Sequence, residues 1–388
     1  MTATAVKEQT EASDSLNALS ELLEILPEKR TEMVAAQQQP DGVVDLLRQA
    51  GIYRALVAKR FGGDEMSPAD FLRIIERIST VDASTGWVAS FGFSAIYLSA
   101  LPLPTLEKMY ANGPDVIFAG GIFPPQPAVP VDGGLKVKGR WAWGSGCTGA
   151  DLIGVGIKVE GSEAAGGLPR IAVMPASKVE IDRGNWDVNG MRGTGSHDMV
   201  VNDVVVPEEW TFVRGGSSSL DEPLYRYPSM ALAAQVLAVV ALGAARGALD
   251  GFIEMAGGRN SITGAPVLAD RAFVQTEIAK AEAAVRSAKA FFYETTEHAF
   301  QALVSGDELD KEQRVMLRLS ASNAARAGAD ACLSVYKVAG TEGIFAGGNI
   351  GQKLQDSLVV PQHAFLSEGT YMSAGRCILG LEPFPGFL

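Results

Sequence analysis

The spacing of apolar residues predicts helices in the first 112 residues of the chain. From Leu16 onwards, apolar positions recur three or four residues apart, as they do on a helix with one buried face. Ser67-Pro68-Ala69-Asp70 predicts a helix start, because serine caps helices, proline suits the first helical position and an acidic residue favours the first turn. Phe71, Ile75 and Ile78 then continue as one buried stripe.

The pattern changes between residues 115 and 215. Short alternating or β-branched runs appear there, separated by glycine, proline and aspartate. Several short strands at close spacing are typical of an antiparallel sheet or a small barrel. The predicted strands are Val116–Ala119, Leu135–Trp141, Leu152–Val159, Ile171–Met174, Val179–Asp182 and Met199–Val206.

Helical spacing returns after residue 216. Four patterns stand out, and helices joined by glycine-rich loops predict a four-helix bundle. They are Ser229–Met255, Val267–Phe300, Leu309–Val338 and Pro361–Leu379. We therefore expect an α+β protein in three parts: an N-terminal helical domain (1–114), a central small antiparallel β-domain (115–215) and a C-terminal four-helix bundle (216–388).

The most apolar run, Met230–Ala245, favours a buried bundle helix over a membrane span. It is shorter than a span requires, contains Gln235 and is followed by Arg246. The first fifteen residues are polar and lack the apolar segment of a secretory signal. We expect no membrane partner and a cytoplasmic location.

Composition narrows the classes of function. With 47% hydrophobic and 20% charged residues, the chain is typical of a globular enzyme. A formal net charge of −12 disfavours nucleic acid as a partner, because phosphate backbones are repelled. Cys147, Cys332 and Cys377 are too few and too far apart for a disulfide framework. With only three histidines besides, no metal site is expected.

The stretch Gly139–Cys147 (GRWAWGSGC) holds the chief candidate chemistry. Glycines inside a strand often mark close approach of the backbone to a ligand. Tryptophan packs on a flat heteroaromatic ring, and serine hydrogen-bonds to one. Taken alone, the stretch is more typical of a bulged core strand that carries two tryptophans. Together with the rest of the chain, it predicts a flavin site.

Gly144, Gly146 and Gly149 spell G-x-G-x-x-G, but we reject a dinucleotide fold. That motif requires a helix directly after it, and here the predicted strand Leu152–Val159 follows. The sequence contains neither a phosphate-binding G-x-x-x-x-G-K-[ST] loop nor a G-x-S-x-G elbow, so serine hydrolase chemistry has little support.

The order of helices, small β-region and bundle, taken with these motifs, resembles the acyl-CoA dehydrogenase superfamily from Phe61 to the C-terminus. Gly139–Ser145 is similar to its G-x-K-x-W-I-T-N flavin segment. The resemblance implies that Trp143 packs beside the isoalloxazine and that Ser145 lies near flavin N5.

Two further segments resemble cofactor-binding parts of the superfamily. Gly190–Asp198 looks like its second β-domain signature, which implies that Arg192 and Thr194 contact the flavin. An ion pair within the β-domain is an equal alternative for Arg192. Arg259, with Gly264 and Pro266, is similar to R-x-x-F-G-x-P, whose arginine reaches the flavin phosphate of a neighbouring subunit. Here the spacing is one residue longer and the phenylalanine is absent, so a solvated arginine at a helix end is the alternative.

Two chemistries compete within this superfamily. Its dehydrogenases carry a catalytic glutamate in Y-E-G-T, and Ser367-Glu368-Gly369-Thr370 is close to that motif. Its flavin-dependent monooxygenases have a segment similar to G-R-W-x-x-x-S-G in the β-domain. Before the last helix they also carry an aspartate that is followed, several residues later, by Gln-His or Ala-His. Here Trp141–Cys147 matches the monooxygenase form, and Asp356 precedes Gln362-His363. We favour the monooxygenase over a dehydrogenase with Glu368 as base; a flavin-free scaffold is the remaining alternative.

The monooxygenase resemblance implies a homotetrameric oxygenase component that receives FMNH2 or FADH2 from a separate NAD(P)H-dependent flavin reductase. With O2 it would hydroxylate a small phenol- or indole-type substrate through a flavin C4a-hydroperoxide. Ser145 would help to retain that adduct, and His363 would deprotonate or orient the substrate. Trp87 would wall the pocket. For Trp87 the structural alternative is a core tryptophan, and for His363 it is a bundle histidine. His197 is expected at the surface or in a turn; the alternative is that its loop lines the flavin.

Overall fold

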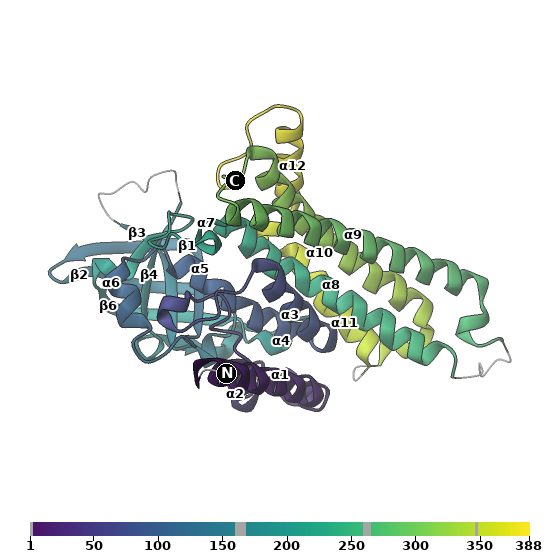
Figure 1. The fold of residues 1–388 in the computed structure, drawn as a ribbon. Coiled ribbons are helices and arrows are strands. Elements are labelled where there is room, and N and C mark those ends of the chain that lie inside the picture. Colours follow the sequence, from purple (N-terminus) through teal and green to yellow (C-terminus); the bar gives the residue numbers. More distant parts are fainter. Residues whose placement is uncertain (1–2, 160–167, 259–264, 346–347) are drawn as a thin grey trace. The chain divides into compact units, whose positions relative to one another are not determined.

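The strands between Phe118 and Val213 form one sheet. The computed structural model describes residues 3–159, 168–258, 265–345 and 348–388, and within them the sheet has seven strands in the order β5-β6-β2-β1-β3-β4-β7 (Figure 1). They are β1 (Phe118–Val131), β2 (Gly134–Gly144), β3 (Leu152–Val159), β4 (Arg170–Pro175), β5 (Glu180–Asp182), β6 (His197–Val206) and β7 (Thr211–Val213). The predicted sheet is confirmed, but it is mixed and not purely antiparallel, since β1 and β3 run parallel.

Strand β1 is much longer than predicted. The pattern indicated Val116–Ala119, whereas β1 continues to Val131 through four prolines. Proline cannot donate to a strand ladder, so this segment does not read as a strand. The sheet accommodates it because the register shifts between Gly121 and Gln126, which leaves Pro124 and Pro125 outside the paired positions.

The core of the sheet is built around Trp141. Its side chain is fully buried, and its indole Nε1 donates to the carbonyl of Gly156 at 2.8 Å. A Cβ on Gly156 would lie 1.9 Å from the carbonyl oxygen of Ile122, so only glycine permits this close strand approach. Of the two tryptophans in the GRWAWGSGC stretch, Trp141 is therefore a core residue.

Packing groups the described chain into two compact units. The first comprises residues 1–67, 91–187 and 192–229; the second comprises 68–90, 188–191 and 230–388. The helices expected in one N-terminal domain are thus divided between the units. The division into 1–114, 115–215 and 216–388 stays a proposal about order along the sequence.

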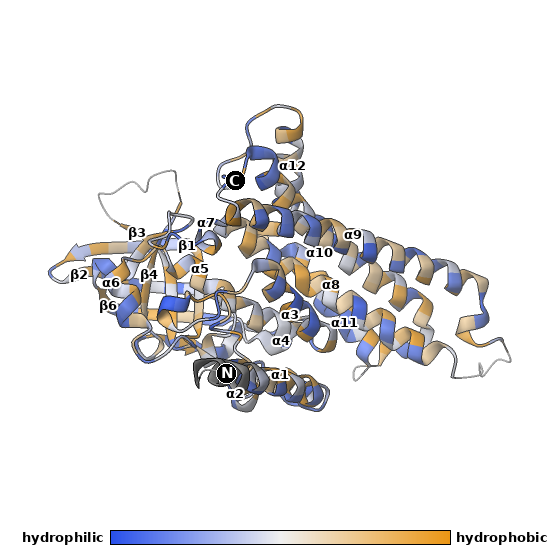
Figure 2. Cartoon of the chain, viewed as in Figure 1, coloured by the Kyte–Doolittle hydropathy of each residue, from blue (hydrophilic) through white to orange (hydrophobic). Residues whose placement is uncertain are grey.

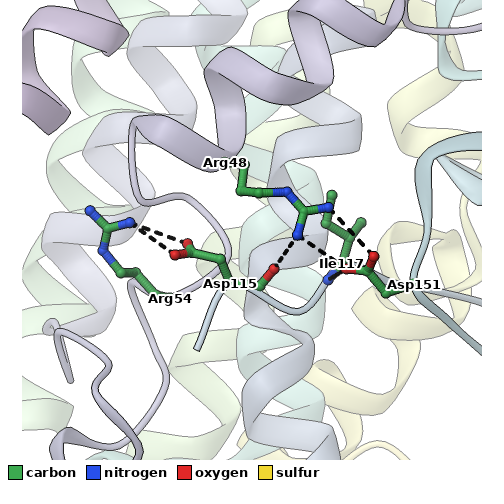
Figure 3. Close-up of polar contacts among 5 residues, drawn as sticks. All are labelled: Arg48, Arg54, Asp115, Ile117 and Asp151. Carbon is green, nitrogen blue, oxygen red and sulfur yellow. Dashed lines mark hydrogen bonds and ion pairs between the residues drawn. The ribbon is translucent and has the colours of Figure 1, made fainter. Parts of the chain in front are cut away.

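In the first unit, polar contacts attach the helix Asp41–Gln49 and the turn after it to the segments that precede β1 and β3. This unit holds α1 (Ala3–Ala36), α2 (Asp41–Gln49), α5 (Ser94–Leu98), α6 (Leu103–Met109) and α7 (Pro223–Arg226). Figure 3 shows Arg48 of α2 donating to the carbonyl of Asp115 at 2.8 Å, while Arg54 pairs with the Asp115 carboxylate at 3.0 Å. Asp151 accepts from the backbone N–H of Ile117 at 2.8 Å, which ties the starts of β1 and β3 together.

The second unit is helical. Its elements are α3 (Pro68–Val81), α4 (Ala83–Ser90), α8 (Ser229–Ala256), α9 (Ala272–Val304), α10 (Lys311–Ala339), α11 (Asn349–Val359) and α12 (Glu368–Ile378). The predicted start at Ser67-Pro68 and the three long bundle helices are confirmed to within a few residues.

Helix α8 is the apolar run identified from the sequence. It extends beyond the apolar run itself, and it is the one helix in the described part of the chain with the length and composition of a membrane span. Its most apolar window is nevertheless 94% buried within the protein. Figure 2 contrasts mostly orange α8 with α9, where blue and orange alternate. This burial supports the bundle-core interpretation.

The fourth bundle helix, predicted over Pro361–Leu379, is wrong as a single helix. Helix α11 ends at Val359, two short 3₁₀ turns follow at Val360–Gln362 and Ala364–Leu366, and α12 begins at Glu368. Pro361 has no N–H to donate to a continuing helix. The break places His363 between the two turns instead of inside a helix.

Candidate functional site

Three buried hydroxyls form a chain in the first unit. Ser145 Oγ lies 2.7 Å from Ser196 Oγ, which lies 2.7 Å from Thr194 Oγ1. Ser145 follows β2, whereas Thr194 and Ser196 belong to the loop before β6. The backbone N–H of Gly146 donates to the carbonyl of Thr194 at 2.9 Å, which holds the two segments together. Two predicted site residues, Ser145 and Thr194, are thus brought together by a serine that the sequence did not single out.

Trp143 combines strain with exposure. Its φ is +64°, in the left-handed region, and its side chain is 67% exposed. This backbone conformation costs an L-residue roughly 1–2 kcal/mol. The register of β2 and β6 shifts between Trp141 and Gly144, which turns the indole of Trp143 out of the sheet. A strained residue that displays a large ring, instead of burying it, is typical of a ligand contact.

These residues fit a flavin. The Trp143 indole offers an exposed flat face, and two residues further along Ser145 supplies a hydroxyl. Arg192, half-buried and 3.6 Å from the exposed Asp187, supplies a cation suited to a phosphate. Hydroxyl, guanidinium and aromatic face are the groups that a flavin cofactor needs from a protein.

Glutamines at the end of α1 anchor the loop that carries Thr194. The side-chain amide of Gln37 donates to the carbonyl of Trp186 at 2.6 Å, and that of Gln39 to the carbonyl of Gly193 at 2.7 Å. Gly195 lies so close to Gln37 that a Cβ would stand 2.8 Å from its carbonyl oxygen. Sequence reasoning missed these residues; the run Gln37-Gln38-Gln39 before Pro40 was the available signal.

His197 and Cys147 are buried beside the hydroxyl chain. The expected surface or turn position of His197 is wrong, because the residue is 1% exposed. Burial lowers the pKa of the imidazole, against an opposing hydrogen bond with the backbone of Gln37. Burial also raises the pKa of the Cys147 thiol to about 12, so that it stays protonated at neutral pH. Both side chains are therefore buried in their neutral forms.

In the second unit Trp87 and His363 meet. Their ring centroids are 6.0 Å apart, with the planes at 64°. Trp87 lies in α4, whose first turn is capped by Asp82 through the N–H and hydroxyl of Thr85, at 2.8 and 2.9 Å. The two predicted substrate contacts, far apart in sequence, are therefore neighbours.

The hydrogen bond to His363 sets its tautomer. Nδ1 accepts from the backbone N–H of Phe365 at 3.2 Å, so in the neutral ring the proton resides on Nε2. A neutral imidazole of this form presents an N–H donor at Nε2 and no second acceptor. This favours contact with a substrate oxygen over abstraction of a proton.

Asp356 anchors the segment 188–191 within the same unit. Its carboxylate accepts from the backbone N–H of Met191 at 2.6 Å, while Met191 holds φ at +58°. A Cβ on Gly190 would lie 2.2 Å from the carbonyl of Gln355, which explains the glycine. Asp356 thus caps a loop from a distant part of the chain.

Glu368 and Arg259 are the remaining predicted site residues, and the structure describes only the first of them. Glu368, at the start of α12, is 74% exposed and paired with Arg326 at 2.7 Å, the arrangement of a surface ion pair. This does not support its role as a dehydrogenase base, which works in a water-poor site. Arg259 lies outside the described residues. Among the residues that are described, no cluster of histidine, cysteine, aspartate or glutamate is arranged to hold a metal.

Comparison with known proteins agrees with these features. Residues 235–368 match the family model described as acyl-CoA dehydrogenase, C-terminal domain. The chain is 53% identical to indole-3-acetate monooxygenase of Pseudomonas putida over 346 residues, covering 89% of this chain and 88% of the relative. It is 30% identical to the flavin-dependent monooxygenase oxygenase subunit HsaA of Rhodococcus jostii, covering 78% and 81%. The crystal structure of 3-HSA hydroxylase from Rhodococcus sp. RHA1 superposes with a TM-score of 0.89 at 26% identity, covering 97% of this chain and 99% of that one.

Proposed function

Because this chain belongs to the flavin-dependent monooxygenase branch of the acyl-CoA dehydrogenase superfamily, we propose that it is the oxygenase component of a two-component system acting on a small indole-type carboxylic acid. The observation that carries the proposal is the 53% identity, over 89% of the chain, to a relative named for indole-3-acetate. Indole-3-acetate is accordingly the first candidate substrate.

The cofactor is reduced flavin, FMNH2 or FADH2, supplied by a separate NAD(P)H-dependent flavin reductase. When bound, it supplies the electrons that activate O2. Trp143 would pack against the ring, Ser145 would hydrogen-bond at its N5 edge, and Thr194 would support Ser145 through Ser196. Arg192 and, from a neighbouring subunit, Arg259 would meet the phosphate.

The substrate-facing residues are Trp87 and His363. The Trp87 ring supplies an apolar wall for a flat heteroaromatic. His363 donates from Nε2–H to an oxygen of the substrate, since its Nδ1 is already engaged by Phe365. An indole N–H cannot donate to that nitrogen, whereas a carboxylate accepts from it well. The tautomer therefore favours an indole acid over an unsubstituted indole.

A phenol-type substrate is the second candidate. A phenolate oxygen would also accept from the Nε2–H of His363. We further propose a cytoplasmic homotetramer; the location is the one favoured by the three free cysteines.

The test is anaerobic reconstitution. The purified protein is mixed with FMNH2 or FADH2 and one substrate, isotopically labelled O2 is admitted, and products are examined by mass spectrometry. We expect one labelled oxygen atom in the product from indole-3-acetate, and much less product from indole. If no aromatic substrate is oxygenated while an acyl-CoA bleaches the FAD-loaded protein, the proposal fails and Glu368 becomes the residue to mutate.

A further inference from the structure

The segment S-E-G-T, which resembles a dehydrogenase motif, contacts the turn that carries His363. Thr370 Oγ1 donates to the carbonyl of Phe365 at 2.9 Å, and Ser367 Oγ donates to the carbonyl of Ala364 at 3.1 Å. Thr370 lies in the first turn of α12 and is 4% exposed, so its hydrogen bond is largely shielded from water. The first and last residues of the segment therefore act on the turn before the helix.

These two hydroxyls hold the two peptide groups on either side of Phe365. The first group contains the Ala364 carbonyl and the Phe365 N–H; the second contains the Phe365 carbonyl and the next N–H. Because a peptide group is planar, a hydrogen bond that orients its carbonyl also orients its N–H. Ser367 therefore orients the N–H that His363 Nδ1 accepts at 3.2 Å. Thr370 orients the following group, whose N–H donates to the His363 carbonyl at 2.9 Å.

Ser367 directs its hydroxyl backward although it occupies the N-cap of α12. A serine at this position ordinarily accepts a hydrogen bond from the second or third N–H of its own helix. Among the described residues around it, the side chain makes no capping hydrogen bond, and it donates to the preceding turn. The hydroxyl therefore contributes to the shape of the turn at His363 and not to the helix end.

Arg318 of α10 adds a third contact to the same turn. Its guanidinium donates to the Phe365 carbonyl at 3.4 Å, and its Cζ lies 5.2 Å from the centroid of the Phe365 ring. The first distance is long for a hydrogen bond, so the Thr370 hydroxyl at 2.9 Å is the stronger donor to that carbonyl. Removal of the Thr370 hydroxyl should therefore loosen the turn without releasing it.

We propose that Thr370 and Ser367 are positioning residues that keep the N–H of Phe365 on Nδ1 of His363. With Nδ1 engaged, the neutral ring carries its proton on Nε2, the atom offered to the substrate. A loosened turn would let the ring rotate or exchange its proton to Nδ1, and Nε2 would then lose its hydrogen. The inference rests on the proposed function, since it takes Nε2–H to meet a substrate oxygen.

The first test is spectroscopic and requires neither flavin nor turnover. Protein labelled with ¹⁵N in histidine is studied by solid-state NMR at pH 8, where the protonated and unprotonated nitrogens of a neutral imidazole give separate signals. The chain has three histidines, so the signals that are lost in His363→Gln assign that residue. In the wild type we expect the Nδ1 signal at the unprotonated position. In Thr370→Val it should move toward the protonated position or split into two.

Steady-state kinetics provide the second readout. Thr370→Val should lower kcat/KM for indole-3-acetate about fivefold, the size of one lost neutral hydrogen bond, and should change kcat/KM for indole much less. Thr370→Ser keeps the hydroxyl and should restore both the NMR signal and the activity. Thr296→Val is the matched control, because Thr296 is a fully buried threonine of the same unit whose hydroxyl donates to the carbonyl of Phe292 at 2.7 Å. It should leave both readouts unchanged.

The outcomes separate positioning from stability. The inference is overturned if the wild-type Nδ1 is already protonated, if Thr370→Val lowers activity while the His363 signals stay in place, or if serine loses as much as valine. Ser367→Ala, at a partly exposed position, gives the same readouts if the valine variant does not fold. If the signals shift as expected but the wild-type protein oxygenates no aromatic substrate, the positioning stands and it is the proposed function that fails.

Discussion

Trp143 and Met191 both hold a bulky side chain in the left-handed backbone region, with φ of +64° and +58°. Met191 is compensated, because Asp356 accepts its N–H and its side chain is buried. Trp143 is exposed, so its strain is not offset by burial of its ring. Backbone strain that no packing within the protein compensates is typical of a residue that contacts a ligand.

Replacement of Trp143 separates strain from function. Trp143→Gly should raise the free energy of unfolding of the flavin-free protein by about 1 kcal/mol, because glycine relaxes the left-handed conformation. Trp143→Ala loses the same ring but keeps the strain, so it should not stabilise. Both variants should bind flavin more weakly. Chemical denaturation and flavin titration measure the two effects; stabilisation by alanine equal to that by glycine would contradict the argument.

The role of His363 as a donor is tested by matched substitutions. His363→Phe removes the Nε2–H, and loss of a hydrogen bond to a charged oxygen should reduce kcat/KM for indole-3-acetate about 10- to 100-fold. His363→Gln retains an N–H donor and should lose less. The comparison uses steady-state kinetics with saturating reduced flavin, and equal losses in the two variants would show that His363 does not act as a donor.

Burial of His197 predicts a stability that depends on pH. Its pKa is lowered first by burial and further by Arg183, while Gln37, Asp182 and Asp198 oppose the shift. The unfolded chain therefore takes up this proton more readily, and stability should be lost as the pH falls through the ordinary histidine value of about 6.5. His197→Phe should reduce the drop in Tm between pH 7.5 and pH 5.5. An unchanged drop would assign the acid sensitivity to other groups.

At the scale of elements, α11 binds the C-terminal end of α3, which is far from it in the sequence, through the side chain of Lys353. Lys353 is 2% exposed, and its ammonium donates to the carbonyls of Ser79, Thr80 and Val81 at 3.0, 2.7 and 2.8 Å. These are the last carbonyls of α3, which have no partner within the helix and where a positive charge is favoured. The next turn begins α4, which carries Trp87.

Removal of this buried cation should destabilise the fold. Lys353→Met retains much of the side-chain length but leaves three helix-end carbonyls without their donor. The free energy of unfolding should fall by roughly 2–4 kcal/mol. Lys337→Met, at an exposed position of α10, is the control and should change stability by less than about 0.5 kcal/mol. Denaturant titrations measure both, and similar values for the two lysines would refute the capping role.

At the scale of the whole molecule, the two-component proposal predicts that a separate reductase oxidises NADH and that this chain oxygenates the substrate. The purified chain alone should oxidise NADH no faster than buffer, and addition of a flavin reductase and FMN or FAD should start oxygenation of the substrate. The reductase need not be a cognate partner if reduced flavin reaches the oxygenase by diffusion. Product formation from NADH by the chain alone would overturn the proposal. Light scattering tests the tetramer, which should have four times the mass of one chain.

The sequence by itself predicted what depends on local pattern. The start of α3 at Ser67-Pro68, the core helix α8 and the strand β3 follow from capping residues and the period of apolar positions, which act over a few neighbours. The order of these elements and the motifs around Trp143 and His363 were also enough to identify the superfamily. The length of β1 was not predicted, because a register shift within the sheet accommodates its prolines. The single helix predicted over Pro361–Leu379 was wrong for a local reason, since proline cannot donate to a continuing helix.

The tertiary structure alone decided the environment of each site residue. Whether Trp143 is strained and whether His197 is buried depend on atoms from other segments. Ser196 shows this most clearly, because the fold places it beside the hydroxyl of the distant Ser145. The sequence gives the identity of each residue. Its long-range hydrogen-bond partners and its solvent exposure are properties of the folded chain, because they depend on contacts between residues that are far apart in the sequence.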